Sequence, residues 1–196
     1  MREKFNEIWK SIKRENKEEV LKYLERSDYF NAPASTKYHS SYEGGLLKHS
    51  IKVYEKLKEL SERNNLKFER EDSIAIISLL HDICKTNYYK VEYRNAKDNN
   101  GNWIKVPYYS VEDKMPLGIH GDKSVMLIQA LGLRLTKEEM YCIRYHMGAY
   151  ECKEIYASLG NAKKRYENIL WVHLADELAS IEEEREDEKT NNMLKV

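Results

Sequence analysis

The stretch Ser73-Ile-Ala-Ile-Ile-Ser-Leu-Leu-His-Asp-Ile-Cys-Lys-Thr86 leads an apolar run directly into a histidine and an aspartate. The apolar positions that recur at helical spacing are Ile74, Ile77, Leu80 and Cys84. This spacing predicts a central helix over residues 70–86. A helix this apolar should be buried, and burying an imidazole beside a carboxylate is costly unless both have partners. A metal ion would satisfy His81 and Asp82 together.

Two readings of this dipeptide remain open at this point. Adjacent residues of a helix point about 100° apart, so His81 and Asp82 are not expected to face one ion squarely. They would then flank two ions, or one would bind an ion while the other bridges. The alternative is a buried hydrogen bond between the two side chains without a metal, and the dipeptide alone favours that alternative.

Composition sets the class of protein. The 196 residues contain 33 Lys plus Arg and 33 Asp plus Glu, so the formal net charge is zero. This balance argues against a chain that coats nucleic acid by charge alone. The length predicts one domain. The charged fraction of 34% and the many Lys, Glu, Asn and Tyr residues suit a soluble, mostly helical protein. Lacking an apolar run of ~18 residues, the chain is not expected to bind or cross a membrane.

The cysteines and the N-terminus predict a compartment. Cys84, Cys142 and Cys152 are odd in number and form no CxxC pair, which is typical of reduced thiols. The first residues carry no apolar core like that of a signal peptide. We therefore expect a cytoplasmic protein, with a homo-oligomer as a possible assembly.

The chain divides into three parts. Residues 1–27 are predicted to form packing helices, residues 28–181 the main domain, and residues 182–196 a charged tail that begins as a solvated helix end and then frays. A loop over 29–45 contains His39, which either faces the site or, as is more common for a lone loop histidine, lies on the surface. A helix over 45–63 follows and carries His49 beside its apolar stripe.

The second half predicts three further helices. His120 stands between two glycines before a helix over 122–132. Thr136-Lys-Glu-Glu139 is a capping box for the next helix, which ends near His146. The last long helix is predicted from Asn161 to about Glu184 and contains Asp176.

Residues 88–109 break the helical pattern. Two segments rich in aromatic and β-branched residues, 88–93 and 103–109, flank a polar turn, which predicts an inserted β-hairpin. Its aromatic residues are Tyr88, Tyr89, Tyr93, Trp103, Tyr108 and Tyr109. They would either wall a pocket and stack on a base, or form the packing surface of the hairpin itself.

Six metal-capable side chains occupy apolar or glycine-flanked positions. They are His49, His81, Asp82, His120, His146 and Asp176. The intervals between them suit one helix plus its connection, so the six could converge inside a helical bundle. Imidazoles and carboxylates without thiolates favour a catalytic site over a structural zinc site.

In this order the six residues resemble the HD-domain superfamily of metal-dependent phosphohydrolases, in its six-ligand, two-metal form. The resemblance spans roughly residues 28–180. Within it, Ala32-Pro-Ala, His39 and Gly44-Gly-Leu-Leu-Lys-His49 resemble the HD domain of bacterial 3′-to-5′ exoribonucleases. The resemblance implies an all-α helical bundle, here with a small inserted hairpin.

The resemblance also implies roles. His49, His81, Asp82 and Asp176 would bind one divalent transition metal ion, and Asp82 would bridge to a second ion completed by His120 and His146. The ions would be Mn, Fe, Ni or Zn, and a hydroxide that bridges them would be the nucleophile.

Further residues are candidates for substrate binding. Lys85 matches the lysine of the HD-x-x-Lys pattern and would hold a phosphate oxygen, or else it is an exposed lysine at a helix end. Lys123, Tyr88 and Tyr89 are the other candidates. His81, Asp82 and Lys85 would be the catalytic residues.

The predicted function is therefore hydrolysis of a phosphodiester or phosphomonoester. The substrate would be a nucleotide, a cyclic nucleotide or a short oligonucleotide. Two alternatives remain open: a di-iron oxygenase of HD fold, and a nucleotide-binding module stabilised by metals.

Overall fold

The computed structural model describes residues 1–193 apart from 99, 116–117 and 151–152. The α-helices are α1 Arg2–Ser11, α2 Lys17–Arg26, α3 Gly45–Asn64, α4 Ser73–Leu80, α5 His120–Ala130, α6 Lys137–Arg144, α7 Tyr156–Arg165 and α8 Asn168–Met193. The strands are β1 Tyr89–Lys97 and β2 Trp103–Val111. The 3₁₀ turns are η1 Ile83–Lys85, η2 Gly148–Tyr150 and η3 Lys153–Ile155. The helical class and the inserted hairpin are as the sequence predicts.

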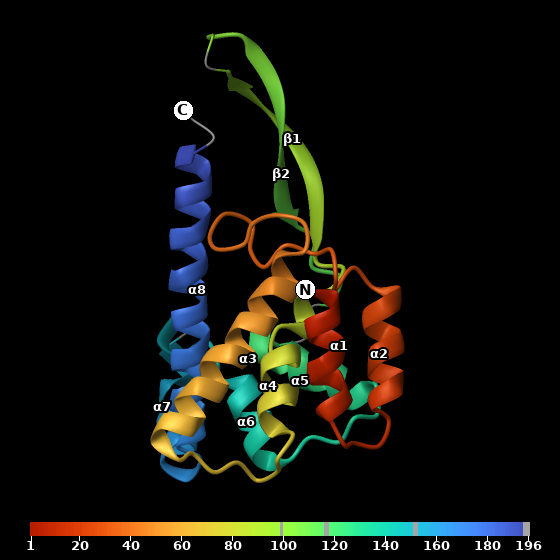
Figure 1. Ribbon diagram of the computed structural model, residues 1–196, viewed down its shortest axis with the longest axis vertical. Coiled ribbons are helices and arrows are strands. Elements are labelled where there is room, and N and C mark those ends of the chain that lie inside the picture. Colours follow the sequence, from red (N-terminus) through yellow and green to blue (C-terminus); the bar gives the residue numbers. More distant parts are fainter. Residues whose placement is uncertain (99, 116–117, 151–152, 194–196) are drawn as a thin grey trace.

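Helix α4 lies in the interior of the helical body, and α3 packs against both α4 and α8 (Figure 1). Ile76, Ile77, Leu79 and Leu80 are all fully buried. Burying one such side chain is worth about 1.5–3 kcal/mol, so this short helix anchors the core. Tyr29 ties the preceding loop to it, because its hydroxyl donates to the Leu79 carbonyl at 2.6 Å.

The central helix is shorter than predicted. It ends at Leu80 instead of reaching residue 86, and Asp82 departs from helical geometry with φ −106° and ψ 16°. The chain then tightens into the 3₁₀ turn η1. Because the backbone changes direction here, His81 and Asp82 both face the same interior space. The expected separation of about 100° assumed an unbroken helix through both residues, and that helix ends before them.

The N-terminal helices are fixed to the body by buried charges. Arg14 follows α1, and its guanidinium lies 2.9 Å from Asp72 and 2.5 Å from Glu139. Glu139 also completes the predicted capping box with Thr136 at the start of α6. One buried cation thus joins the starts of α4 and α6.

The C-terminal region differs from the prediction. Residues 161–184 do not form one helix, because the chain is extended at Tyr166 between α7 and α8. Asn161 lies inside α7 and does not cap the long helix. Helix α8 continues to Met193, so the solvated helix end predicted beyond Ile181 is present but longer than expected, and residues 182–193 are helical instead of frayed.

The hairpin stands away from the helical body (Figure 1). Strands β1 and β2 pair antiparallel, with Tyr89 opposite Val111 and Lys97 opposite Trp103. Toward the tip, Tyr93 is 66 % exposed and Trp103 is 70 % exposed. The expectation that all the hairpin rings line one pocket is therefore wrong for these two residues, because the long strands carry them away from the body.

None of the helices in the described part of the chain combines the length and the apolar character that crossing a bilayer requires.

Candidate metal centre

The structure brings the six metal-capable residues together from five parts of the chain. They come from α3 (His49), the turn after α4 (His81 and Asp82), the start of α5 (His120), the turn after α6 (His146) and α8 (Asp176). Each residue approaches at least one other closely enough to share an ion. His81 belongs to two such groups, one with His49 and Asp176 and one with Asp82 and His146.

Asp82 is the meeting point of the centre. Its Oδ1 lies 2.5 Å from His120 Nε2 and 3.5 Å from His146 Nε2. Its Oδ2 lies 3.5 Å from His81 Nε2 and 2.7 Å from Lys85 Nζ. Burial opposes its charge, but Lys85 and the imidazoles hold the pKa of this carboxyl well below its usual range. Asp82 is therefore an ionised carboxylate placed to bridge.

His49 and Asp176 form the other side of the centre. His49 Nε2 lies 3.0 Å from Asp176 Oδ1, and the rings of His49 and His81 meet edge to face. Burial lowers the pKa of His49, but hydrogen bonds to Asp176 and Glu183 outweigh it and raise that pKa to about 10. Burial likewise opposes the charge of Asp176, whose pKa is lowered by His49.

His81 and His146 each have one ring nitrogen that faces the centre without a proton. The Nδ1–H of His81 donates to the Ser78 carbonyl at 2.9 Å, and that of His146 donates to the Ile143 carbonyl at 2.7 Å. The lone pair of Nε2 on each ring therefore faces inward. Both Nε2 atoms are buried without a hydrogen-bond partner in the described structure.

These observations fit a metal centre. An unpartnered buried nitrogen is costly, and a metal ion removes the cost for both rings. The donors are imidazoles and carboxylates, which suit zinc, iron, nickel or manganese. A simple buried His81–Asp82 hydrogen bond does not account for the site, because the 3.5 Å between these side chains is too long.

Two glycines let the elements approach. A Cβ on Gly121 would lie 2.2 Å from the Arg144 carbonyl oxygen, so only glycine lets the start of α5 pack against the end of α6. Gly148 has φ +57°, and a Cβ there would lie 2.5 Å from His173 Nε2. His173 in turn holds the turn after α6, since its Nδ1–H donates to the His146 carbonyl at 2.7 Å. These contacts place His120 and His146 side by side.

Lys85 lies in the centre and is not an exposed lysine at a helix end. Its ammonium contacts Asp82 and donates to the Ala34 carbonyl at 2.7 Å. Burial opposes its charge, but Asp82 raises its pKa above the usual value. Tyr89 donates to the same Ala34 carbonyl at 3.2 Å, which joins the base of the hairpin to the centre.

Lys123 and Tyr88 lie together near this base. The ammonium of Lys123 lies 5.8 Å from the centroid of the Tyr88 ring and also pairs with Asp113. Tyr88 packs against Tyr89 with ring centroids 5.1 Å apart. A phosphate that reached Lys123 would compete with Asp113 for it.

Three residues near the centre did not stand out as ligands in the sequence. His39 is half-buried, with its ring 4.7 Å from that of His49 and its Nε2 buried without a partner. Burial and the charge of His49 lower the pKa of His39 to about 4. Glu183 is fully buried and contacts His49.

The third is Cys84, whose Sγ lies 3.2 Å from His120 Nδ1. Burial raises the pKa of this thiol to about 12, so it stays protonated and is a poor ligand by itself. Cys84 and Cys142 are both free, and Cys152 lies outside the described residues. The sequence signal for Cys84 was its place two residues after Asp82.

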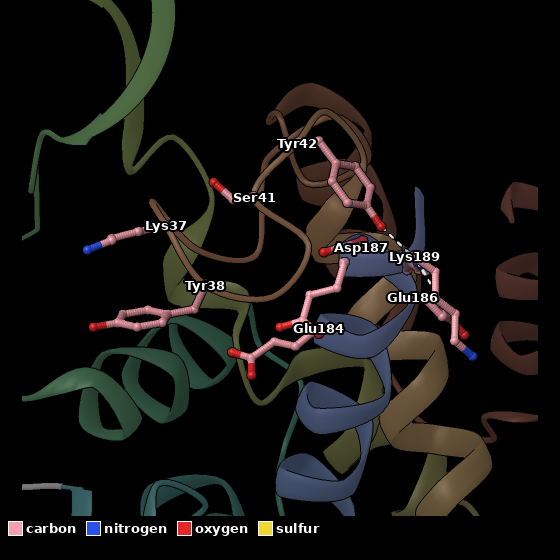
Figure 2. A pocket seen from close by; sticks show the side chains of 10 residues that line it. Lys37, Tyr38, Ser41, Tyr42, Glu184, Glu186, Asp187 and Lys189 are labelled. Atoms are coloured by element: carbon pink, nitrogen blue, oxygen red, sulfur yellow. Dashed lines mark hydrogen bonds and ion pairs between the residues drawn. The ribbon is translucent and has the colours of Figure 1, made fainter. Parts of the chain in front are cut away.

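A groove of about 1030 Å³ lies beside the centre (Figure 2). The loop before α3 contributes Lys37, Tyr38, Ser41 and Tyr42, α3 contributes Lys48, and α8 contributes Glu184, Glu186, Asp187, Glu188 and Lys189. None of the six candidate ligands lines it. The carboxylates of Glu184, Glu186, Asp187 and Glu188 line one side. The ammonium groups of Lys37, Lys48 and Lys189 line it as well, so the groove carries both signs of charge.

Comparison with known proteins places this site in a family. A family model described as the HD domain matches residues 46–181, and the six candidate ligands lie inside the match. The match covers more than half of the chain, which therefore belongs to the HD-domain family. This membership supports a metal-binding, hydrolase-type protein. Searches of curated proteins and of solved structures gave no match.

Proposed function

We propose that the protein is a phosphohydrolase that uses two divalent transition metal ions. The observation that carries the proposal is the position of Asp82 between three imidazoles and the Lys85 ammonium, beside the His49–Asp176 pair. Two adjacent donor groups joined by one carboxylate would hold a pair of ions. When bound, such ions supply Lewis-acid activation of water and of a phosphoester.

The residues of the chain would then have separate tasks. His49, His81, Asp82 and Asp176 would hold one ion, while Asp82, His120 and His146 would hold the other. Lys85 is a fixed positive charge in contact with Asp82, so it supports the orientation of that carboxylate and faces the negative charge of a phosphate. The buried Lys123 would bind a second phosphate oxygen or a neighbouring phosphate.

The proposed substrate is a nucleotide, a cyclic nucleotide or a short oligonucleotide. The rings of Tyr88 and Tyr89 at the base of the hairpin support it, because they lie next to Lys85 and Lys123. A cytoplasmic location and a homo-oligomeric state stay predictions from the sequence.

The test is a phosphoester panel assayed without oxygen. Protein purified anaerobically and loaded separately with Mn²⁺, Fe²⁺, Ni²⁺ or Zn²⁺ is expected to release phosphate or to cleave a diester with at least one substrate. Oxygen consumption is measured in parallel with the same compounds. Substrate-dependent oxygen uptake without phosphoester turnover would support the di-iron oxygenase, and substrate binding without either reaction would support a binding module.

The hairpin offers a second test, of substrate recognition. Base–aromatic stacking is worth ~1–3 kcal/mol, so Tyr89→Leu is expected to raise the KM about tenfold or more. Tyr89→Phe keeps the ring and loses only the contact with Ala34, so its KM is expected to change less. Trp103→Leu, at the exposed end of β2, is the matched control, and its KM is expected to equal that of the wild type. Equal KM values in all three variants would refute stacking at the hairpin base.

A further inference from the structure

Glu183 is an exception among the acidic residues of α8. It follows Asp176 by seven residues, or about two helical turns, and therefore lies on the same face of the helix. Its neighbours Glu182 and Glu186 are partly exposed and pair with Lys56 and Lys52 of α3. Glu183 instead is 0 % exposed. A carboxylate this deep needs a specific partner.

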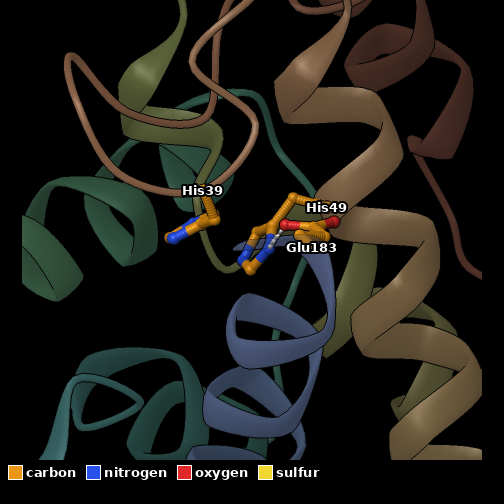
Figure 3. A group of neighbouring side chains, drawn as sticks. All are labelled: His39, His49 and Glu183. Carbon is orange, nitrogen blue, oxygen red and sulfur yellow. Dashed lines mark hydrogen bonds and ion pairs between the residues drawn. The ribbon is translucent and has the colours of Figure 1, made fainter. Parts of the chain in front are cut away.

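That partner is the metal-ligand candidate His49 (Figure 3). Glu183 Oε2 lies 3.1 Å from His49 Nδ1, while the other ring nitrogen, Nε2, lies 3.0 Å from Asp176. Glu183 Oε1 is buried without a hydrogen-bond partner in the described structure. No lysine or arginine pairs with Glu183 among the described contacts. The carboxylate is therefore placed for the imidazole.

The same geometry raises the question of a third ion. His39, His49 and Glu183 lie close enough to share one. An imidazole ligates two cations only after both of its ring protons are lost, however, and a neutral imidazole offers one lone pair. If His49 binds an ion through Nε2 beside Asp176, its Nδ1 keeps a proton. A third ion at Nδ1 and a ligand at Nε2 therefore exclude each other.

We propose that Glu183 is a positioning residue that keeps the proton of His49 on Nδ1 and aims Nε2 into the metal centre. A carboxylate that accepts the far N–H of a ligating histidine fixes the tautomer and ring orientation and raises the basicity of the ligating nitrogen. The inference rests on the proposed metal centre. It adds a residue that lies beyond the matched family segment.

The experiment measures zinc binding by wild-type protein, Glu183→Gln, Glu183→Leu and the control Glu182→Gln at one fixed pH. Affinity comes from chelator competition and stoichiometry from metal analysis. Glu183→Gln keeps an acceptor but loses the charge, so its zinc affinity is expected to fall about tenfold. Glu183→Leu loses the acceptor too, so its zinc affinity is expected to fall about a hundredfold. Glu182→Gln is expected to match the wild type, and the number of ions at saturation is expected to stay the same in all four.

A second measurement separates positioning from packing. In zinc-loaded wild-type protein, ¹⁵N spectra of the histidine rings are expected to show His49 protonated on Nδ1 and ligated through Nε2. A purely structural role would lower the melting temperature of the metal-free variants without changing zinc affinity, and that result would overturn the proposal. Loss of one whole equivalent of zinc, with the affinity of the rest unchanged, would also overturn it by making Glu183 a ligand.

The two proposals fail differently. If Glu183→Gln binds zinc as tightly as the wild type, the positioning role is wrong even if Glu183→Leu does not fold, and the metal centre stands. If the wild type itself binds neither zinc nor manganese, both the metal centre and the positioning role are wrong.

Discussion

Asp82→Asn is expected to lower phosphoester hydrolysis by about a thousandfold or more. Asp82 approaches three imidazoles and Lys85, so no other side chain of the centre has as many partners. An amide cannot bridge two cations as a carboxylate does, and loss of metal assistance is worth several kcal/mol, or about a factor of ten per 1.4 kcal/mol. The measurement is kcat/KM on the best substrate of the panel, together with the metal content of the purified variant.

Two variants keep this result interpretable. Glu59→Gln removes an exposed carboxylate on α3 and is expected to retain wild-type activity and metal content. His146→Gln removes a ligand nitrogen without removing the partner of Lys85, so it tests the centre even if Asp82→Asn leaves that ammonium unpaired and destabilises the fold. Circular dichroism shows whether each variant is folded. A folded Asp82→Asn protein with wild-type turnover and metal content would refute the proposed centre.

The second large effect is that of pH on metal affinity. In the metal-free protein, the pKa of His49 is about 10, because hydrogen bonds to Asp176 and Glu183 outweigh its burial. An ion that binds through Nε2 must displace a proton from this imidazolium. The apparent association constant is therefore expected to rise up to about tenfold per pH unit between about pH 6.5 and pH 10. Chelator competition at pH 6.5, 7.5 and 8.5 measures the slope.

Calorimetry gives an independent check. Titrations in buffers with different ionisation enthalpies are expected to show release of about one proton for the ion that His49 binds. His49→Gln retains a side chain of similar length without an imidazole proton to displace and is expected to flatten the slope. An affinity that does not change with pH in the wild type would contradict the assignment of His49 as a ligand.

The same pKa determines how the metal-free fold responds to pH. A pKa raised in the folded state stabilises the protein fully below the unfolded value of about 6.5, and the contribution is lost as pH rises through the folded value of about 10. The metal-free protein is thus expected to lose stability through His49 between these limits. In metal-loaded protein His49 does not carry that proton. The melting temperature of metal-loaded protein is therefore expected not to fall with pH through His49.

The amino-acid sequence by itself determined the class of fold and the six metal-capable residues. Apolar spacing around Ile77, the capping box at Thr136 and the hairpin pattern reflect local physics, which a short window of sequence contains. The six residues were identifiable because each is a metal-capable side chain at an apolar or glycine-flanked position. Their order then indicated the family, and the matched segment 46–181 agrees with it.

Only the tertiary structure decided how these residues meet. The end of α4 at Leu80 turned His81 and Asp82 toward one space, and the short η1 turn set Lys85 against Asp82. Helix α8 extends beyond the end of its apolar pattern because α3 packs along it. Lysines of α3 pair with the acidic residues of this extension. Because α3 and α8 pack together, Glu183 within that acidic run is buried in contact with His49 of α3. The burial of a charged residue and its contacts depend on elements that are distant in the chain. Residue type and periodicity alone therefore do not predict them.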